Sequence, residues 1–415
     1  MVYVVVSTVA ALTLPRLEFA YAHHHLTEVS LESARDVFAT IAGGMMAFTG
    51  IVFAIAFLVV QFGSAAYSPR LAVMFAQRPA MYHVLGIFFA TFTYSLAALT
   101  WTDRNGTGAA PLFSSLLVGL LLVISLFAFA LLVRSIDTLQ IHKVMQAIGR
   151  QGRRVIADMP PADAVDRGDD GLGEATPPGP PVQKLAYTGE PQVLAELDLR
   201  ALLDLALEAD AVIDVECSVG DALMEDGLMA SVYGTSKLPE AALRRAFRLA
   251  PLGTFEQDPR FAIRLLVDVA IRALSPAVND PTTAVQAIDQ IEDLMHRLGR
   301  RQLDSGSITD AAGVMRVVFP APSWEDYLEL SFDEIRHYGT TSLQIQRRLR
   351  AALAGVAEAL PEGDRRNAVS HYLIHMDECM TRSTFDTQDR EAGLVADPQG
   401  LGSPRRRTSA LPLSH

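Results

Sequence analysis

The chain has few cysteines and no excess of positive charge. Its 415 residues include only Cys217 and Cys379, which lie far apart in the sequence. A disulfide framework therefore has no support, and reduced thiols in the cytoplasm are the simpler expectation. Lys and Arg number 35 against 47 Asp and Glu, so the formal net charge is −12. Because phosphate binding needs a basic face, we expect no nucleic-acid partner.

Motifs of the common enzyme classes are also missing. The sequence contains no Walker-type phosphate loop, no dinucleotide fingerprint, no zinc-protease helix motif and no nucleophile elbow. No Cys–His or carboxylate pair stands out as catalytic. Enzyme function therefore has little support, and we expect no catalytic residue and no cofactor.

Histidines occur at two places where a metal site has to be considered. His371 and His375 lie four residues apart, a spacing that metal sites use. The apolar stripe of the predicted helix includes Val369 and Met376, which places both histidines on the opposite, wet face. The run at residues 23–25 lies in a predicted extracytoplasmic loop, where adventitious binding is the alternative. We expect no resident metal at either place.

Charged side chains are missing from three long stretches, Thr40–Phe62, Val84–Trp101 and Leu112–Val133. Roughly 20 apolar residues form a helix that crosses the hydrocarbon core of a bilayer. The pattern predicts three membrane spans in the first third of the chain and a water-soluble remainder. The absence of Asp, Glu, Lys and Arg within them disfavours a proton relay.

The first residues allow two interpretations. Met1–Leu14 is apolar, but about 14 residues make only about 21 Å of helix, less than the hydrocarbon core. The sequence at residues 20–22 is similar to a signal-peptide cleavage site, although no basic residue precedes the apolar run. We favour a first span whose beginning is missing from this version of the chain, which gives four spans with both ends inside.

Basic residues indicate the orientation. Two of them, Arg70 and Arg78, occupy the loop between the first two clear spans, which has no acid. Five follow the third clear span: Arg134, Lys143, Arg150, Arg153 and Arg154. The flank at residues 15–36 is richer in acids. Because short basic loops stay inside, we expect the large remainder to be cytoplasmic.

Small residues form a stripe on one face of the first clear span. The stripe consists of Gly43, Ala47, Gly50 and Ala54. Such a stripe lets another helix approach closely, and a pore-lining or hinge role is the alternative. Gln61 and Ser64 follow at the cytoplasmic end, where polar side chains can mark a permeation path but water is also available.

The remainder is predicted to be an α+β domain, mostly helical with a small β unit. Asp198 caps a helix that begins at Leu199, and strands are predicted at residues 211–217, 228–233 and 314–319. Helices are predicted at residues 261–274, from 281 onwards, and at 324–337, 342–360 and 365–382. The Gly-Asp turns are similar to those of barrels that carry biotin or lipoate, but no lysine occupies the turn.

The predicted domain boundaries follow from composition. They are a membrane module at 1–148, a Gly- and Pro-rich linker at 149–183, a β unit at 184–234, a helical part at 238–390 and a disordered tail at 391–415. The fold class is thus an α-helical membrane module followed by a cytoplasmic α+β domain.

One predicted helix carries charges along an otherwise apolar surface. The candidate site consists of Arg264, Asp268, Arg272, Asn279 and Asp280. Asp280 is the predicted N-cap of the helix that begins at Pro281. One interpretation is a buried ion-pair network with an ordinary cap. The other is a pocket in which two arginines and a helix N-terminus hold an anionic ligand, although the Asp280 carboxylate would compete for the amides.

Four stretches resemble a known family. Residues 33–71 (SARDVFATIAGG…AAYSPRL), 83–99 (HVLGIFFATFTYSLAAL), 255–291 (FEQDPRFAIRL…AIDQI) and 332–339 (FDEIRHYG) are similar to a bacterial family of predicted membrane proteins. That family is catalogued as domain of unknown function number 2254. The resemblance implies four spans in the bacterial inner membrane. It implies no activity, cofactor or functional residue.

Two functional hypotheses follow. In the first, several subunits form a permeation pathway for an ion or small solute, assembled or gated by the cytoplasmic domain. A homo-oligomer in the lipid bilayer is then expected. In the second, the spans are an anchor and the cytoplasmic domain is a ligand sensor or a scaffold for other proteins.

Overall fold

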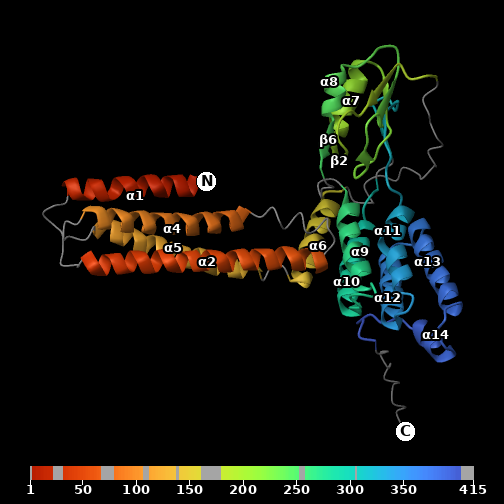
Figure 1. Ribbon diagram of the computed structural model, residues 1–415. Helices are drawn as coiled ribbons and strands as arrows, with labels where there is room; N and C mark the ends of the chain where they lie inside the picture. The colour runs from red at the N-terminus through yellow and green to blue at the C-terminus, as the bar shows by residue number, and fades with distance from the viewer. Residues whose placement is uncertain are drawn as a thin grey trace, which may run out of the picture. The chain divides into compact units, whose positions relative to one another are not determined.

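Helices dominate both units of the protein (Figure 1). The computed structural model describes residues 2–21, 31–66, 79–105, 112–136, 140–159, 179–251, 258–303 and 306–402. The chain divides into two compact units, Met1–Gln140 and Ile141–His415. The described helices of the first unit are α1 (Val2–Tyr21), α2 (Leu31–Ala66), α4 (Pro79–Asn105) and α5 (Leu112–Ile136).

The helices of the first unit pack side by side, with α4 in contact with the other three (Figure 1). Three of them contain a stretch long and apolar enough to cross a membrane: Glu32–Ile55, His83–Trp101 and Leu112–Arg134. The three clear spans predicted from the sequence are therefore confirmed as helices of sufficient length. The shorter apolar helix Val2–Leu14 forms most of α1.

Hydrogen bonds and aromatic contacts hold this bundle together. In α1, the Ser7 hydroxyl donates to the Ala90 carbonyl of α4 at 2.9 Å. Thr91 of α4 and Ser125 of α5 share a hydroxyl–hydroxyl bond of 2.9 Å. Phe48 of α2 lies edge-on to Phe129 of α5. Because lipid offers no hydrogen-bonding partner, hydroxyl groups that pair between helices stabilise the bundle.

The second unit combines a helical part with a β part. The helical part contains α6 (Ile141–Asp158), α9 (Pro259–Ala273), α10 (Pro281–Leu298), α11 (Trp324–Tyr338), α12 (Leu343–Ala359), α13 (Asp364–Thr381) and α14 (Thr387–Gly393). The helices predicted at 261–274, 324–337, 342–360 and 365–382 are confirmed to within two residues at each end. Their apolar faces meet around α10, which packs against α6, α9 and α12.

The β part contains two sheets with helices α7 (Leu199–Glu208) and α8 (Glu240–Arg245). Its strands are β1 (Gln183–Ala186), β2 (Gln192–Leu197), β3 (Val212–Val215), β4 (Ala222–Leu223), β5 (Leu228–Tyr233), β6 (Phe247–Ala250), β7 (Ser307–Thr309) and β8 (Met315–Val318). The orders are β1-β5-β3-β8-β7 and β4-β2-β6. Only β3 and β8, among the described strands, pair in parallel, with Ile213 opposite Val317.

The β part is larger than the sequence predicted. The predicted unit ended at residue 234, yet β6, β7 and β8 come from the segment assigned to the helical part. Val317 of β8 is fully buried in the same apolar cluster as Ile213 and Val232. The core of the sheet is therefore completed by a strand that follows α9 and α10 in the chain.

Two predicted boundaries also need correction. Residues 149–158 of the predicted linker belong to α6, which packs on α9 and α10; residues 160–178 lie outside the described residues. Residues 391–402 of the predicted tail are ordered, because Arg347 of α12 donates to the Val395 and Gly402 carbonyls at 3.0 Å each. Residues 403–415 lie outside the described residues.

Candidate functional site

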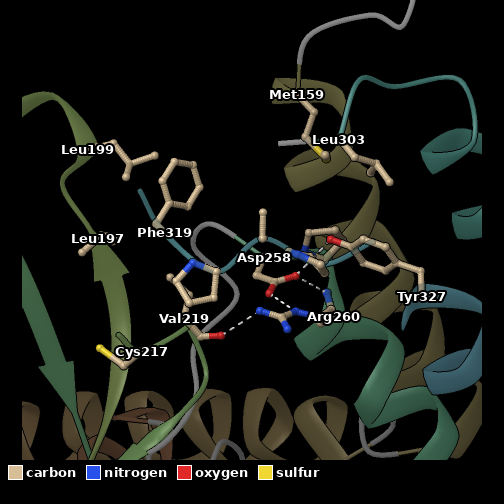
Figure 2. A pocket seen from close by; sticks show the side chains of 14 residues that line it. Met159, Leu197, Leu199, Cys217, Val219, Asp258, Arg260, Leu303, Phe319 and Tyr327 are labelled. Atoms are coloured by element: carbon tan, nitrogen blue, oxygen red, sulfur yellow. Dashed lines mark hydrogen bonds and ion pairs between the residues drawn. The ribbon is translucent and has the colours of Figure 1, made fainter. Parts of the chain in front are cut away.

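A cavity of about 250 Å³ opens between the β part and the helical part of the second unit (Figure 2). Its apolar wall includes Leu197, Leu199 and Phe319 from the β part and Met159 and Leu303 from the helical part. Polar groups come from Cys217, Asp258, Arg260 and Tyr327. An apolar cavity with a few converging polar groups is the usual form of a small-molecule site.

Asp258 lies at the centre of the polar wall (Figure 2). It is the N-cap of α9, and its carboxylate accepts the Arg260 backbone N–H at 2.7 Å and pairs with the Arg260 Nε. The Tyr327 hydroxyl of α11 lies 3.4 Å from Asp258 Oδ1. The side chain is only 13% exposed. Burial raises the pKa of Asp258, and the charge of Arg260 opposes that rise.

Arg260 joins the two parts of this unit. Besides Asp258, its guanidinium donates from Nη2 to the Val219 carbonyl in the β part at 3.1 Å. Asp258 and Arg260 carry opposite charges, so together they leave the polar wall close to neutral. A site of this kind favours an uncharged ligand over an anion, since each buried charge already has its partner.

Cys217 contributes a neutral thiol to the wall. Burial, together with the nearby carboxylates of Asp221 and Glu216, raises its pKa to about 12. Its Sγ lies 3.7 Å from the Met229 carbonyl, to which it donates. Because the thiolate is the nucleophilic form, this raised pKa makes Cys217 a poor nucleophile at neutral pH.

Sequence reasoning missed this cavity. One signal was present: Asp258-Pro259 repeats the Asp-Pro cap that was recognised at Asp280-Pro281. The lining residues come from segments more than 100 residues apart in the chain, so no local pattern could bring Cys217 and Tyr327 together.

Arg264, the first residue of the predicted charged site, already has carboxylate partners. It donates to both carboxylate oxygens of Glu334 in α11 at 2.8 Å each, and to Asp268 Oδ1 at 2.8 Å. The hydrogen bond to Glu334 is the main reason that the pKa of Arg264 is raised, and the same bond lowers the pKa of Glu334. This geometry favours the ion-pair interpretation over an anion pocket.

The other members of the predicted charged site lie toward the far end of α9. Arg272 is exposed in its last turn. Asn279 follows with a left-handed φ of 48°, and the Asp280 backbone N–H donates to the Ala273 carbonyl at 2.7 Å. Asp280 is the N-cap of α10, as predicted, and its carboxylate accepts the Thr283 N–H at 3.1 Å. Its carboxylate thus occupies the amide that an anion would need.

The small-residue stripe of α2 faces away from the rest of the first unit. Gly43, Ala47, Gly50 and Ala54 are all exposed, and the buried face of α2 is formed instead by Phe38, Ala42, Met45 and Val52. Apart from the adjacent residues and the backbone of α2 itself, no atom of the described residues lies within 4 Å of the position that a Cβ would take at Gly43 or Gly50. Gln61 and Ser64 fall within α2, but their side chains lie outside the described residues.

Helix α6 packs closely against α9 and α10. A Cβ at Gly152 would lie 3.0 Å from the Ala262 Cβ and from the Leu294 methyl groups. Arg153 pairs with Asp293 of α10 at 2.8 Å. Helix α5, which contains the third candidate span, ends at Ile136, and α6 begins at Ile141, so four residues separate the two helices in the chain.

Histidines give no sign of a metal centre in the described part of the chain. His371 and His375 are exposed on α13, as expected. No group of three or more His, Cys, Asp or Glu residues is arranged to hold a metal among the residues that the structure describes.

Comparison with known proteins supports the resemblance found in the sequence. The model of a family described as Predicted membrane protein (DUF2254) matches residues 1–355. Uncharacterized proteins of Mycobacterium bovis and Mycobacterium tuberculosis are each 28% identical over 377 residues, which covers 88% of this chain and 71% of theirs. No solved structure matches the chain.

Proposed function

Because the chain belongs to the family of predicted membrane proteins DUF2254, whose function is unknown, we propose a function from its geometry. The protein is an oligomeric pathway for an ion or small solute in the bacterial inner membrane. In this proposal α1 is a fourth span and the second unit is cytoplasmic, where it assembles or gates the pathway.

The outward stripe of α2 is the observation that carries this proposal. Among the described residues, nothing fills the space beside the two glycines of the stripe, Gly43 and Gly50, although helices in lipid gain most of their association energy from close contact. A second copy of the chain that packs its own α2 against this face would bury the stripe. A ring of such contacts places the small residues near the symmetry axis.

Helix α6 supplies the connection that gating requires. Its glycines and Arg153 hold it to α9 and α10, while only four residues separate its N-terminus from α5 in the chain. A rearrangement of the helical part would therefore pull on the end of a membrane helix. Rigid elements joined in this way can pass a conformational change between units.

The test is the number of subunits of the full-length protein, measured by native mass spectrometry after purification in detergent. Gly50→Leu fills the stripe, and we expect it to reduce or abolish the oligomer. Gly44→Leu is the matched control, because Gly44 has equally open space but lies about 100° from Gly43 around the helix. An unchanged oligomer in Gly50→Leu, or a monomeric wild type, would contradict the proposal.

The alternative is a membrane-anchored ligand sensor or interaction scaffold. The cavity beside Asp258 and Tyr327 favours it, because an apolar cavity with a neutral polar wall suits a small metabolite. In this case the stripe of α2 could be filled by leucine without loss of function. A monomer that retains a stoichiometric small molecule in the same measurement would support the sensor.

A further inference from the structure

We propose that the exposed face of helix α6 binds the anionic lipid headgroups of the membrane that α5 has just left. The surface consists of Lys143, Arg150 and Arg154, called the basic stripe below. The proposal rests on the proposed cytoplasmic side of the second unit but not on transport, since a sensor anchored by the same helices would carry the same surface.

The three side chains lie on one face of α6. Arg150 follows Lys143 by seven residues, and Arg154 follows Arg150 by four. At about 3.6 residues per turn, these spacings place the three side chains within about 40° of one another around the helix axis. The distance along the axis from Lys143 to Arg154 is about 16 Å, enough to meet more than one headgroup. A single continuous face is therefore positive over three turns.

This face is open. The opposite face of α6 is buried against α9 and α10, with Val144, Ile148 and Ile156 in the core. Lys143 is partly exposed, and Arg150 and Arg154 are exposed. Within the described ranges, none of the three has a hydrogen bond or an ion pair, whereas the neighbouring Arg153 is bound to Asp293.

Chain connectivity keeps the basic stripe near the bilayer. Only residues 137–140 separate the end of α5 from Ile141. A chain spans at most about 3.5 Å per residue, so the start of α6 cannot lie far from the place where α5 leaves the hydrocarbon. Basic residues immediately beyond a span bind anionic lipids through their charge.

Charge complementarity identifies the partner. Helix α6 carries four basic residues and one acid, although the whole chain has 47 acids and 35 Lys and Arg. With the second unit on the cytoplasmic side, as proposed above, the cytoplasmic leaflet is a negatively charged surface that chain connectivity keeps close to α6.

The experiment measures lipid adducts on the full-length protein by native mass spectrometry. Phosphatidylglycerol or phosphatidylcholine is added to the detergent-purified protein, and the bound fraction is compared with that of the Lys143→Gln, Arg150→Gln, Arg154→Gln triple variant. We expect the variant to bind phosphatidylglycerol about a hundredfold more weakly, at about fivefold per charge, with phosphatidylcholine unchanged.

The matched control removes the same charge elsewhere. Arg200, Lys237 and Arg245 are exposed basic residues of the β part, and their triple change to Gln is expected to leave lipid binding as in the wild type. Equal phosphatidylglycerol binding by the α6 variant and the wild type would overturn the proposal. Equal weakening by both triple variants would also overturn it, because only net charge would then matter.

Two measurements on the wild type complete the test. Phosphatidylglycerol binding must fall as the salt concentration rises, because salt screens exposed charges. This measurement needs no variant, so it still tests the proposal if the triple variant fails to fold. Loss of the lipid in excess inorganic phosphate at constant ionic strength would show a soluble-anion site instead, and would overturn the assignment to lipid.

Discussion

Several enclosed arginines of the second unit are paired with carboxylates of their own or a neighbouring helix. Arg348 of α12 has only 5% of its side chain exposed, and it pairs with Asp289 of α10 at 2.8 Å and with Glu292 of the same helix. Arg264 of α9 pairs with Asp268 of its own helix and with Glu334 of α11. Breaking such a pair leaves a charge without its partner, so these residues determine how the helices can pack.

The pair between Arg264 and Glu334 predicts a defined pH dependence. Because the pKa of Glu334 in the folded protein lies below its ordinary value of 4.5, the pair stabilises the fold fully above that pH. The contribution is lost as the pH falls through the lowered pKa. Glu334→Gln should therefore lower the melting temperature near neutral pH, and its difference from the wild type should shrink on acidification.

Thermal unfolding of the full-length protein in detergent, followed over this pH range, checks the prediction. Glu329→Gln on the exposed face of the same helix is the control and should show a smaller difference at neutral pH. If the difference in melting temperature between Glu334→Gln and the wild type stays constant with pH, the lost contact is not electrostatic.

At the scale of residues, helix caps could be predicted from the sequence, but the partners in the ion pairs could not. Asp198 and Asp280 were identified because a cap depends on neighbours within three residues, and both accept the expected backbone N–H. Glu334 is 70 residues from Arg264 in the chain. The sequence indicated that Arg264 needs a partner, and only the fold could say which carboxylate it is.

At the scale of elements, α6 shows that a segment with two glycines can still form a helix. Gly149 and Gly152 were interpreted as the start of a linker, because glycine weakens an isolated helix. In the structure they are the residues that let α6 approach α9 and α10. A helix that gains its stability from packing tolerates glycine where the neighbour is closest.

Gly152→Leu tests that contact. A leucine side chain would enter the space held by Ala262 and Leu294 and should destabilise the packing of α6 by about 1–3 kcal/mol. Ala147→Leu is the control, since Ala147 is exposed on the same helix. Thermal unfolding and limited proteolysis would report the loss. Equal stability of the two variants would show that α6 is loosely attached.

For the whole molecule, composition and hydropathy predicted the division into a membrane unit and a mostly helical second unit. They could not predict which strands pair. Strand β3 and its parallel neighbour β8 are about 100 residues apart, with α9 and α10 between them. A parallel pair needs a long crossover, so its register depends on the packing of everything between the strands.

Val317→Asp tests whether the distant strand completes the core. Val317 is fully buried opposite Ile213, so an unpaired carboxylate there should cost more than about 3 kcal/mol. Hydrogen exchange should show lost protection in β3 and β5 as well as in β8. Val314→Asp, three residues earlier and exposed, should leave the protection intact; damage confined to β8 would contradict the pairing.

The parallel pair also sets the order of events during synthesis. β3 is complete at Val215, but its partner ends only at Val318. At about 5–20 residues per second, the ribosome needs roughly 5–20 s to supply the missing strand. During that interval one edge of β3 has no neighbour, and an unpaired edge invites pairing with another chain. Nascent copies translated side by side would meet in this state, so we expect aggregation to increase when ribosomes follow one another closely on the message.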